Sequence, residues 1–420
     1  MISIILVFVC FLSFVGLGGT CWCIRAGVLR ACVTMLSTSI GDLELPCCVY
    51  NAAGPRTNTQ EHLELIADSA SGAVLCKSAT LEKRTGNPLP RYVELPNEGG
   101  GGGTSCPTSM NSEGLPNAGI DYYISDEVVS ALKSSDHPNK PYIVSVSGLK
   151  LESNLTMIAM AAAKDGVDGI ELNLACPNVP GKPIVAYDFE QLEDILQHVS
   201  ELDLHGKSIG VKLAPYFDNT HFERVAATIN KHDIDYVVCT NTIGNGLMVD
   251  TDLEMASIAP NGGFGGIAGG HIKYTALANV RKFRLLLEPR IKIVGVGGVS
   301  TGRDAFDLIL CGAAAVQVGT AHKSEGPSCF NRIAKELEEL MVQKGYSSIE
   351  DFRGKLKPYS RQLARQKPRV SKRGKKSKGD DLAGVSAQTA AVMRSVIFIL
   401  LGIIAWLLRE RYMKGTPDEV

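Results

Sequence analysis

Eight short apolar segments, each a candidate β-strand, limit the folds open to this chain more than any other feature. They lie at residues 47–51, 73–77, 142–147, 169–174, 208–213, 236–240, 291–296 and 315–319. Nearly continuous apolar character is typical of strands whose two faces are both covered, as in a parallel sheet. Helical periodicity falls between most of them. In residues 218–230, for example, Phe222, Val225 and Ile229 recur on one face.

These strand–helix alternations predict an α/β fold, a closed (β/α)8 TIM barrel over residues 35–352. An open, doubly wound sheet is the structural alternative, but no GxGxxG motif follows a candidate strand. Residues 97–109 interrupt the pattern with five consecutive glycines followed by Thr-Ser-Cys-Pro-Thr-Ser. That composition predicts a loop or insertion.

The first 34 residues precede the barrel pattern. Residues 1–24 are uncharged and rich in Ile, Val, Leu and Phe, and Arg25 and Arg30 follow them. Because the basic start of a secretory signal peptide is missing, residues 1–34 are predicted to hold a signal anchor. The alternative is an upstream extension of a protein whose globular pattern begins at Met35.

The C-terminal part is predicted to contain a basic flexible linker (353–386), a transmembrane helix (387–408) and a polar tail (409–420). Twelve Lys or Arg and no acidic residue lie between positions 353 and 378. The uncharged run 395–408 is shorter than the ~20 residues a span needs, and extension back to 387 requires that Arg394 be accommodated. A buried or interfacial amphipathic helix is the alternative. Basic residues on the barrel side of both apolar segments predict a membrane-anchored protein with a cytoplasmic catalytic domain.

The charge distribution and the cysteine spacing indicate which ligands and cross-links to expect. The net charge is −1, but the basic linker masks a clearly acidic remainder, so no nucleic-acid partner is expected. The linker is expected to be solvated or to contact anionic lipid. The twelve cysteines lack the spacing of a disulfide framework or a zinc site. We therefore expect reduced thiols and no bound metal.

Reactive side chains follow the candidate strands. Cys176 comes directly after the strand 169–174, between Asn173 and Asn178 and before a Pro/Gly loop. A thiol there can act as a base or nucleophile, while carboxamides orient a planar polar substrate. The alternative for one cysteine is a small buried apolar residue. Since catalytic residues of a barrel stand at the carboxyl ends of its strands, the other polar strand ends are candidates too. These are Lys77, Ser78, Lys212, Thr240, Asn241 and Thr242.

Glycine-rich turns after the late strands predict an anion site. One turn contains Gly297 and Gly298, and another contains Gly319 and Thr320. Glycines let backbone N–H groups approach a phosphate, and phosphate sites after strands 7 and 8 recur in this fold. A further glycine-rich loop, residues 264–270, suits a flat ligand lying against the backbone. The residues thus predict a phosphate-bearing cofactor and a carboxamide-rich pocket without defining the reaction.

Seven ordered motifs lie along the predicted barrel. They are NLACPNVPGKP (173–183), KSATLEKRTGNPLPRY (77–92), NSEGLPN (111–117), VKLAPYF (211–217), NTIGNG (241–246), TALANV (275–280) and KGY (344–346). Together these motifs resemble class 1A dihydroorotate dehydrogenases, fumarate-linked flavoenzymes of pyrimidine biosynthesis. The resemblance covers about residues 36–358.

The resemblance implies a homodimeric FMN enzyme that oxidises (S)-dihydroorotate to orotate and reduces fumarate to succinate. Cys176 would be the catalytic base. The substrate would be bound by Lys77, Asn111, Ser112, Glu113, Gly114, Leu115, Asn173, Asn178, Asn241 and Thr242. FMN would be bound by Ala53, Gly54, Lys77, Ser78, Asn173, Lys212, Thr240, Gly265, Gly266, Gly297, Gly298, Gly319 and Thr320.

The chain departs from the family pattern near the substrate. Ala175 stands where members usually have serine, Glu113 occupies a position that is more often apolar, and the polyglycine insertion precedes Asn111. These departures predict altered rates more than inactivity. The alternatives are a quinone acceptor, an NAD-linked partner protein, or a membrane-tethered flavin-binding scaffold without turnover.

Overall fold

The computed structural model describes residues 23–25, 28–30, 35–95, 106–134, 140–176 and 184–366. The chain divides into two compact units, Met1–Lys357 and Pro358–Val420, and the second contributes the short helix α12 (Arg361–Gln366). Strands β1 (Cys23–Arg25) and β2 (Val28–Arg30) form an antiparallel pair. The rest of the N-terminal segment, the polyglycine run and the expected membrane helix at 387–408 lie outside the described residues. Within the described ranges no helix is long and apolar enough to span a bilayer.

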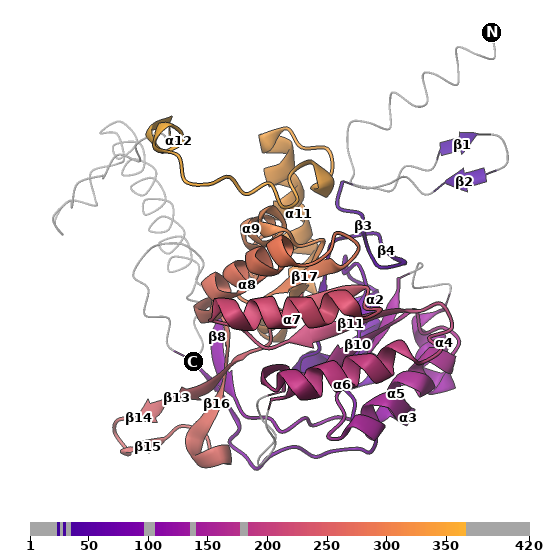
Figure 1. The fold of residues 1–420 in the computed structure, drawn as a ribbon. Coiled ribbons are helices and arrows are strands. Elements are labelled where there is room, and N and C mark those ends of the chain that lie inside the picture. Colours follow the sequence, from indigo (N-terminus) through magenta and orange to yellow (C-terminus); the bar gives the residue numbers. More distant parts are fainter. Residues whose placement is uncertain are drawn as a thin grey trace, which may run out of the picture. The chain divides into compact units, whose positions relative to one another are not determined.

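A parallel sheet of eight strands confirms the predicted barrel (Figure 1). The strand order follows the chain, as a (β/α)8 barrel requires, and each predicted apolar segment contains one strand. The strands are β5 (Val49–Asn51), β6 (Val74–Leu75), β9 (Tyr142–Val146), β10 (Gly169–Asn173), β11 (Ser208–Leu213), β12 (Tyr236–Cys239), β17 (Lys292–Val296) and β18 (Ala315–Val318).

The seam between β5 and β6 is closed by a side chain. Asn51 Nδ2 donates to the carbonyl of Leu75 (2.6 Å), and the amide of Leu75 donates to Asn51 Oδ1 (2.9 Å). Asn51 is fully buried, so both ends of its carboxamide replace the backbone pairing that these strands lack. The amide of Gly72 also donates to the carbonyl of Val49 (2.8 Å), so Asn51 and this backbone bond complete the barrel where no ladder forms.

Helices follow most barrel strands and cover the outside of the sheet. Local capping explains their starts: Asp218 accepts from the amide of Thr220 ahead of α7, and Thr301 forms a capping box with Asp304 ahead of α9. The helices are α2 (Gln60–Ala67), α3 (Ile120–Tyr123), α4 (Asp126–Leu132), α5 (Leu151–Ala163), α6 (Phe189–Ser200), α7 (Asn219–Lys231), α8 (Lys273–Leu286), α9 (Gly302–Cys311), α10 (Thr320–Glu325) and α11 (Ser328–Lys344).

Two apolar layers stabilise this unit. The larger fills the space between the strands and the outer helices, and the smaller fills the barrel interior. The hairpin β3 (Thr38–Ile40) and β4 (Leu43–Leu45) adds Ile40, Leu43 and Leu45 to the interior layer. Because Ile40 and Leu45 are almost fully buried, this hairpin is part of the core.

A second, antiparallel sheet was not predicted from the sequence. It consists of β7 (Tyr92–Glu94), β8 (Thr108–Asn111), β13 (Ile243–Leu247) and β16 (Phe264–Gly269), in the order β13-β16-β8-β7. The pair β14 (Val249–Asp250) and β15 (Met255–Ala256) extends beyond β13 and β16 (Figure 1). The sheet joins segments that precede and follow the middle of the chain, so local pattern alone could not reveal it.

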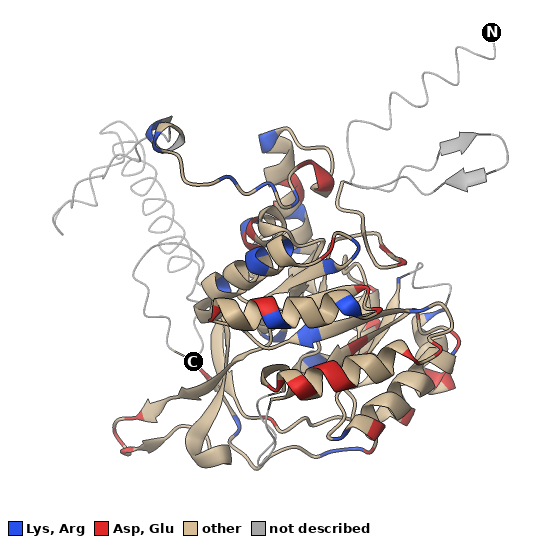
Figure 2. Cartoon of the chain, in the orientation of Figure 1, with Lys and Arg blue, Asp and Glu red and all other residues tan. Residues whose placement is uncertain are grey.

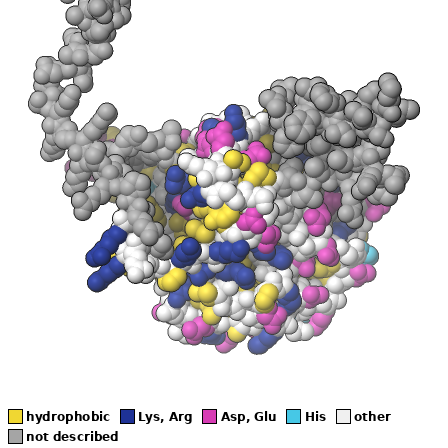
Figure 3. Space-filling view, turned by 90° about the horizontal axis from the view of Figure 1, so that it is seen from above, with side chains coloured by type: hydrophobic (Ala, Val, Ile, Leu, Met, Phe, Trp, Pro, Cys, Tyr) yellow, Lys and Arg dark blue, Asp and Glu magenta, His cyan; other side chains and the backbone are white. Residues whose placement is uncertain are grey.

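Charged side chains lie mainly on the helices and loops that surround the strands (Figure 2). One face of the molecule carries hydrophobic, basic and acidic side chains interspersed (Figure 3). Barrel strands, by contrast, bury nearly all their side chains, and the few charged ones among them are Glu171 on β10, Lys212 on β11 and the half-buried Lys292 on β17. Charge inside a barrel is costly unless it is paired, which marks the first two residues for closer analysis.

We predict that Gly210→Ala on β11 destabilises the barrel. A Cβ at Gly210 would stand 2.0 Å from the ring of Tyr236, which is buried and donates from its hydroxyl to the carbonyl of Ile170. The ring must shift, so the free energy of unfolding should fall by about 1–3 kcal/mol, as for other overpacked cores. Denaturant unfolding measures the change. An unchanged midpoint would show that the interior adapts freely around Tyr236.

Candidate active site

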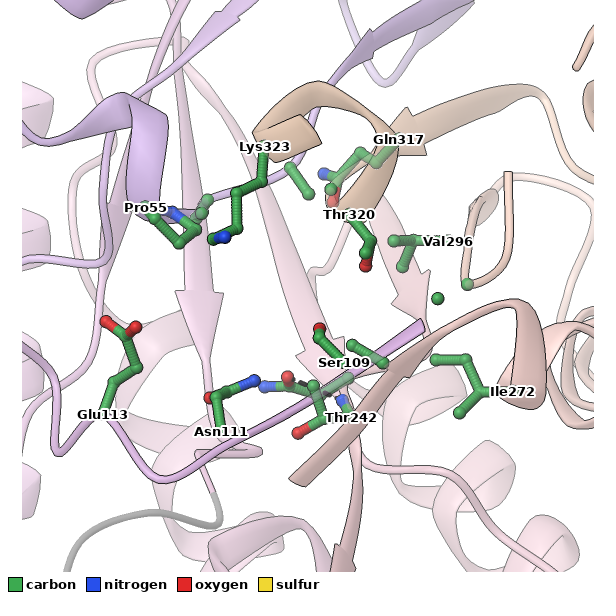
Figure 4. Close-up of a pocket in the computed structure, with 18 of the residues that line it drawn as sticks. Pro55, Ser109, Asn111, Glu113, Thr242, Ile272, Val296, Gln317, Thr320 and Lys323 are labelled. Atoms are coloured by element: carbon green, nitrogen blue, oxygen red, sulfur yellow. Dashed lines mark hydrogen bonds between the residues drawn. The ribbon is translucent and has the colours of Figure 1, made fainter. Parts of the chain in front are cut away.

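The carboxyl ends of the barrel strands and the second sheet enclose one cleft, with about 1100 Å³ of space between its walls and out to its open mouth (Figure 4). Most residues expected to bind substrate or cofactor line it. They are Ala53, Gly54, Lys77, Ser78, Asn111, Glu113, Leu115, Asn173, Cys176, Lys212, Thr240, Asn241, Thr242, Gly297, Gly298, Gly319 and Thr320.

Four expected residues do not line the cleft. Gly265 and Gly266 belong to β16, where their backbone lies against Asn111 of β8, so these glycines serve strand packing. Ser112 is fully buried, and Gly114, with φ +71°, shapes the turn after it. Asn178 lies outside the described residues, as does all of residues 177–183.

The sequence missed several residues that line the cleft. Tyr92 and Ser109 come from the unpredicted second sheet, and Lys323 comes from α10. Lys323 and Glu113 reach into the same open space from different walls (Figure 4). Gln317 could have been found from the sequence, because a side-chain amide within the apolar strand 315–318 is unusual.

Carboxamides and hydroxyls form a fixed polar network at the strand ends. Asn173 Nδ2 donates to Ser78 Oγ (3.1 Å), and Asn173 Oδ1 accepts from Asn241 Nδ2 (3.2 Å) and from the amide of Ala175 (3.1 Å). Ser78 Oγ lies 2.9 Å from Ser145 Oγ. These bonds hold the Asn173 side chain in one orientation before any ligand arrives.

Lys77 lines the cleft within electrostatic range of the Cys176 thiol and the Glu113 carboxylate. Its side chain is almost fully buried, and burial lowers its pKa, while the negative charges of Glu113 and Cys176 act in the opposite direction. Glu113 is the single acidic residue among the described residues that line the cleft. Lys77 can therefore favour the thiolate of Cys176 and attract an anionic ligand, while Glu113 competes with that ligand.

The two late glycine turns lie side by side, because β17 pairs with β18. Gly297 has φ +130° and Gly298 has φ +73°, conformations that favour glycine. A Cβ on Gly298 would also meet Lys273 Cβ at 2.6 Å. These turns follow strands 7 and 8 of the barrel, the usual place for a phosphate in this fold.

Three buried hydroxyls in the cleft lack a hydrogen-bond partner among the described residues. They belong to Tyr92, Thr240 and Thr242, and all three residues line the cleft. A buried hydroxyl without a partner costs free energy, so these atoms are natural contacts for a polar ligand. No cluster of three His, Cys, Asp or Glu suited to a metal ion occurs in the described part of the chain.

Fold and site together define a (β/α)8 barrel enzyme whose cleft combines a thiol, lysines and carboxamides with an anion cradle. The sequence profile of the dihydroorotate dehydrogenase family matches residues 35–341. The chain belongs to the dihydroorotate dehydrogenase family.

Named relatives agree with this assignment. The chain is 48% identical over 323 residues to dihydroorotate dehydrogenase A (fumarate) of Lactococcus lactis, covering 77% of this chain and 99% of the relative. It is 46% identical over 321 residues to a putative dihydroorotate dehydrogenase A (fumarate) of Streptococcus pyogenes, covering 76% and 98%. A crystal structure of the Eimeria tenella enzyme in complex with ferulenol has a similar fold, with a TM-score of 0.62 and 21% identity, covering 76% of this chain and 88% of that one.

Proposed function

We propose that this chain oxidises (S)-dihydroorotate to orotate with bound FMN and passes the electrons to fumarate, as a step of de novo pyrimidine biosynthesis. The observation that carries the proposal is the meeting of Cys176, Lys77 and three asparagines in one cleft. The named relatives of nearly the full barrel length support the same reaction and the same acceptor.

The cleft fits FMN in three respects. The adjacent turns at Gly297–Gly298 and Gly319–Thr320 suit a phosphate, and the Thr240 hydroxyl lacks a partner among the described residues. Lys212, which is 5% exposed, presents a cation to the cleft. Bound FMN would accept a hydride from C6 of the substrate. Ala53, Gly54, Lys77, Ser78 and Asn173 would hold the remainder of the cofactor.

The substrate is anionic and planar with two amide groups, which suits the opposite side of the cleft. The Lys77 ammonium would pair with its carboxylate, and Asn111, Asn173, Asn241 and Thr242 would bind its ring amides. Asn173 is pre-oriented by Ser78 and Asn241, so little ordering is needed on binding.

Cys176 would remove the proton from C5 of dihydroorotate. The C5 proton goes to the sulfur as the C6 hydride leaves, so the substrate loses two electrons and two protons in forming the double bond of orotate. Reduction of fumarate to succinate consumes the same number. Nearby positive charge from Lys77 favours the thiolate, the form of cysteine that acts as a base.

Anaerobic flavin absorbance tests the proposal on the purified full chain. Dihydroorotate should bleach the flavin, and fumarate should restore it. Restoration by a soluble quinone alone would make the acceptor a quinone, and restoration only with NAD and a partner protein would make it NAD-linked. Absence of flavin or of bleaching would leave a scaffold without turnover.

Cys176→Ala should slow bleaching by dihydroorotate by about 10²–10⁴-fold, the usual contribution of a positioned base. Flavin content should stay at the wild-type level, because the expected cofactor residues are unchanged. Stopped-flow absorbance measures the rate. Cys106→Ala is the control, because Cys106 is also half-buried but does not line the cleft. A fast Cys176→Ala variant would refute the assignment of the base.

Glu113→Gln should lower KM for dihydroorotate by about two- to fivefold near neutral pH, because a half-exposed like charge is removed beside an anionic substrate. Glu113 also raises the pKa of Lys77, which burial lowers. Without Glu113 that pKa falls further, so binding should weaken at a lower pH than in the wild type as the solution becomes alkaline. KM measured across pH tests both effects. Glu82→Gln on an exposed loop should change neither.

We also propose that the chain forms a homodimer. The support is a group of exposed apolar side chains on and beside the β13–β15 extension, where Leu247, Val249, Leu253 and Met255 are each about half exposed or more. Exposed apolar residues gathered in this way often mark an interface. Sedimentation equilibrium of the purified protein measures the mass, and a monomer at micromolar concentration would contradict the proposal.

Membrane attachment through residues 387–408, with the catalytic unit on the cytoplasmic side, remains part of the proposal. Its support is the uncharged apolar run 395–408 and the basic segment 353–378 on the barrel side of it. Cell fractionation should find the full chain with membranes and a chain lacking residues 387–420 less so. If the two chains were found with membranes to the same extent, residues 387–408 would not be the anchor.

A further inference from the structure

One carboxylate inside the barrel has no place in the mechanism above. Glu171 is fully buried on β10, and its neighbours Ile170 and Leu172 face the outer apolar layer. Its side chain therefore faces the barrel interior, in keeping with the alternation of a strand. Glu171 does not line the cleft, so it reaches ligands only through other side chains.

Two residues connect Glu171 to the cleft. Lys212 Nζ lies 3.8 Å from Glu171 Oε1 and 3.4 Å from Gln317 Oε1, and both Lys212 and Gln317 line the cleft. Glu171 Oε1 makes no hydrogen bond within the described structure, so Lys212 is the cation that this oxygen faces. Lys212 and Gln317 therefore connect the buried Glu171 carboxylate to the cleft, where Lys212 is expected to lie beside the flavin.

The orientation of the Gln317 amide matches an ionised pair. Its Nε2 donates to Glu171 Oε2 (2.6 Å) and to the hydroxyl of Tyr50 (3.1 Å), while its Oε1 faces the Lys212 ammonium. An amide gives its N–H groups to a carboxylate and its oxygen to a cation, as it does here. The Gln317 amide thus contacts the Glu171 carboxylate through its nitrogen and the Lys212 ammonium through its oxygen.

We propose that Glu171 is a positioning residue that, through Gln317 and Lys212, supplies the counter-charge which lowers the reduction potential of the bound flavin. The inference rests on the proposed function. Reduction adds negative charge to the cofactor, which the Lys212 cation favours and the Glu171 carboxylate opposes. A lower potential makes the reduced cofactor a better donor to the second substrate.

Other ionisable groups also face this pair. From neighbouring strands, burial raises the pKa of Tyr50 and Tyr236 well above the usual value and raises that of Cys76 to about 12. Lys77 also lies within electrostatic range of Lys212, and burial lowers its pKa. Lys77 is present in wild type and variants alike, so its influence cancels in a comparison.

Glu171→Gln tests the inference, because it removes the charge and keeps the shape. The flavin is equilibrated anaerobically with fixed ratios of dihydroorotate and orotate, and the reduced fraction is read from absorbance. We expect the equilibrium to shift about tenfold toward the reduced form, which is about 30 mV for a two-electron couple. Bleaching by dihydroorotate should become faster and recovery on fumarate slower. A purely structural defect would slow both.

The pH dependence of the flavin reduction potential is a second test of the inference. Burial raises the pKa of Glu171, with Lys212 and Gln317 opposing that shift, so the wild-type carboxylate gains its proton at a higher pH than an exposed one. As pH falls, the wild-type potential should converge on that of Glu171→Gln. Lys212→Met should shift the potential the opposite way. Without Lys212 burial favours the neutral form of Glu171, so adding Glu171→Gln to that variant should change little. Glu339→Gln on the outer helix α11 is the matched control.

The outcomes separate the two proposals. If the wild-type chain holds no flavin or is not bleached by dihydroorotate, the proposed function fails whatever Glu171 does. If the wild type is bleached and Glu171→Gln has an unchanged or lower potential, the counter-charge inference is wrong. Should Glu171→Gln lose its flavin, Glu171→Asp retains the charge one methylene further back and should shift the potential in the same direction by less. An unchanged Asp variant would then overturn the inference.

Discussion

Closure of the barrel at Asn51 is the interaction on which the site depends. The other seven seams are backbone ladders, but β5 and β6 meet through the carboxamide of Asn51, bonded to both backbone groups of Leu75. Only a closed barrel directs eight carboxyl ends toward one opening. Lys77 follows β6 and Ala53 follows β5. Asn51 and two backbone bonds, from the amide of Gly72 to the carbonyl of Val49 and from the amide of Lys77 to the carbonyl of Thr57, hold these two walls of the cleft together.

Polarity inside the barrel is graded along its axis. Near the hairpin β3–β4 the interior is filled by Ile40, Leu43 and Leu45. Closer to the cleft, Tyr50, Glu171 and Gln317 form a polar layer in which the Gln317 amide donates to the hydroxyl of Tyr50 and to Glu171 Oε2. Lys212 stands above that layer. The apolar base excludes water from below, which strengthens every charge interaction above it.

Sequence periodicity predicted the barrel because the information is local. Each strand is a continuous apolar run, and caps such as Asp218 and Thr301 lie within a few residues of the helices that they start. The meeting of Cys176, Lys77 and Lys212 in one cleft could be predicted as well, because the fold alone brings strand ends together. The second sheet could not, since β8 pairs with β16 some 150 residues later and its strands have no repeating apolar pattern.

Gly265 and Gly266, which were expected to bind the cofactor, do not line the cleft, and they show where sequence reasoning reaches its limit. A glycine records that something approaches the backbone closely, but not what approaches it. At Gly298 the neighbour is Lys273 and the positive φ shapes a turn at the cleft, whereas at Gly265 the neighbour is the Asn111 carbonyl of a paired strand. Glu171 illustrates the converse. Its carboxylate was visible within an apolar strand, yet only the distances to Lys212 and Gln317 show that this buried charge contacts residues that line the cleft.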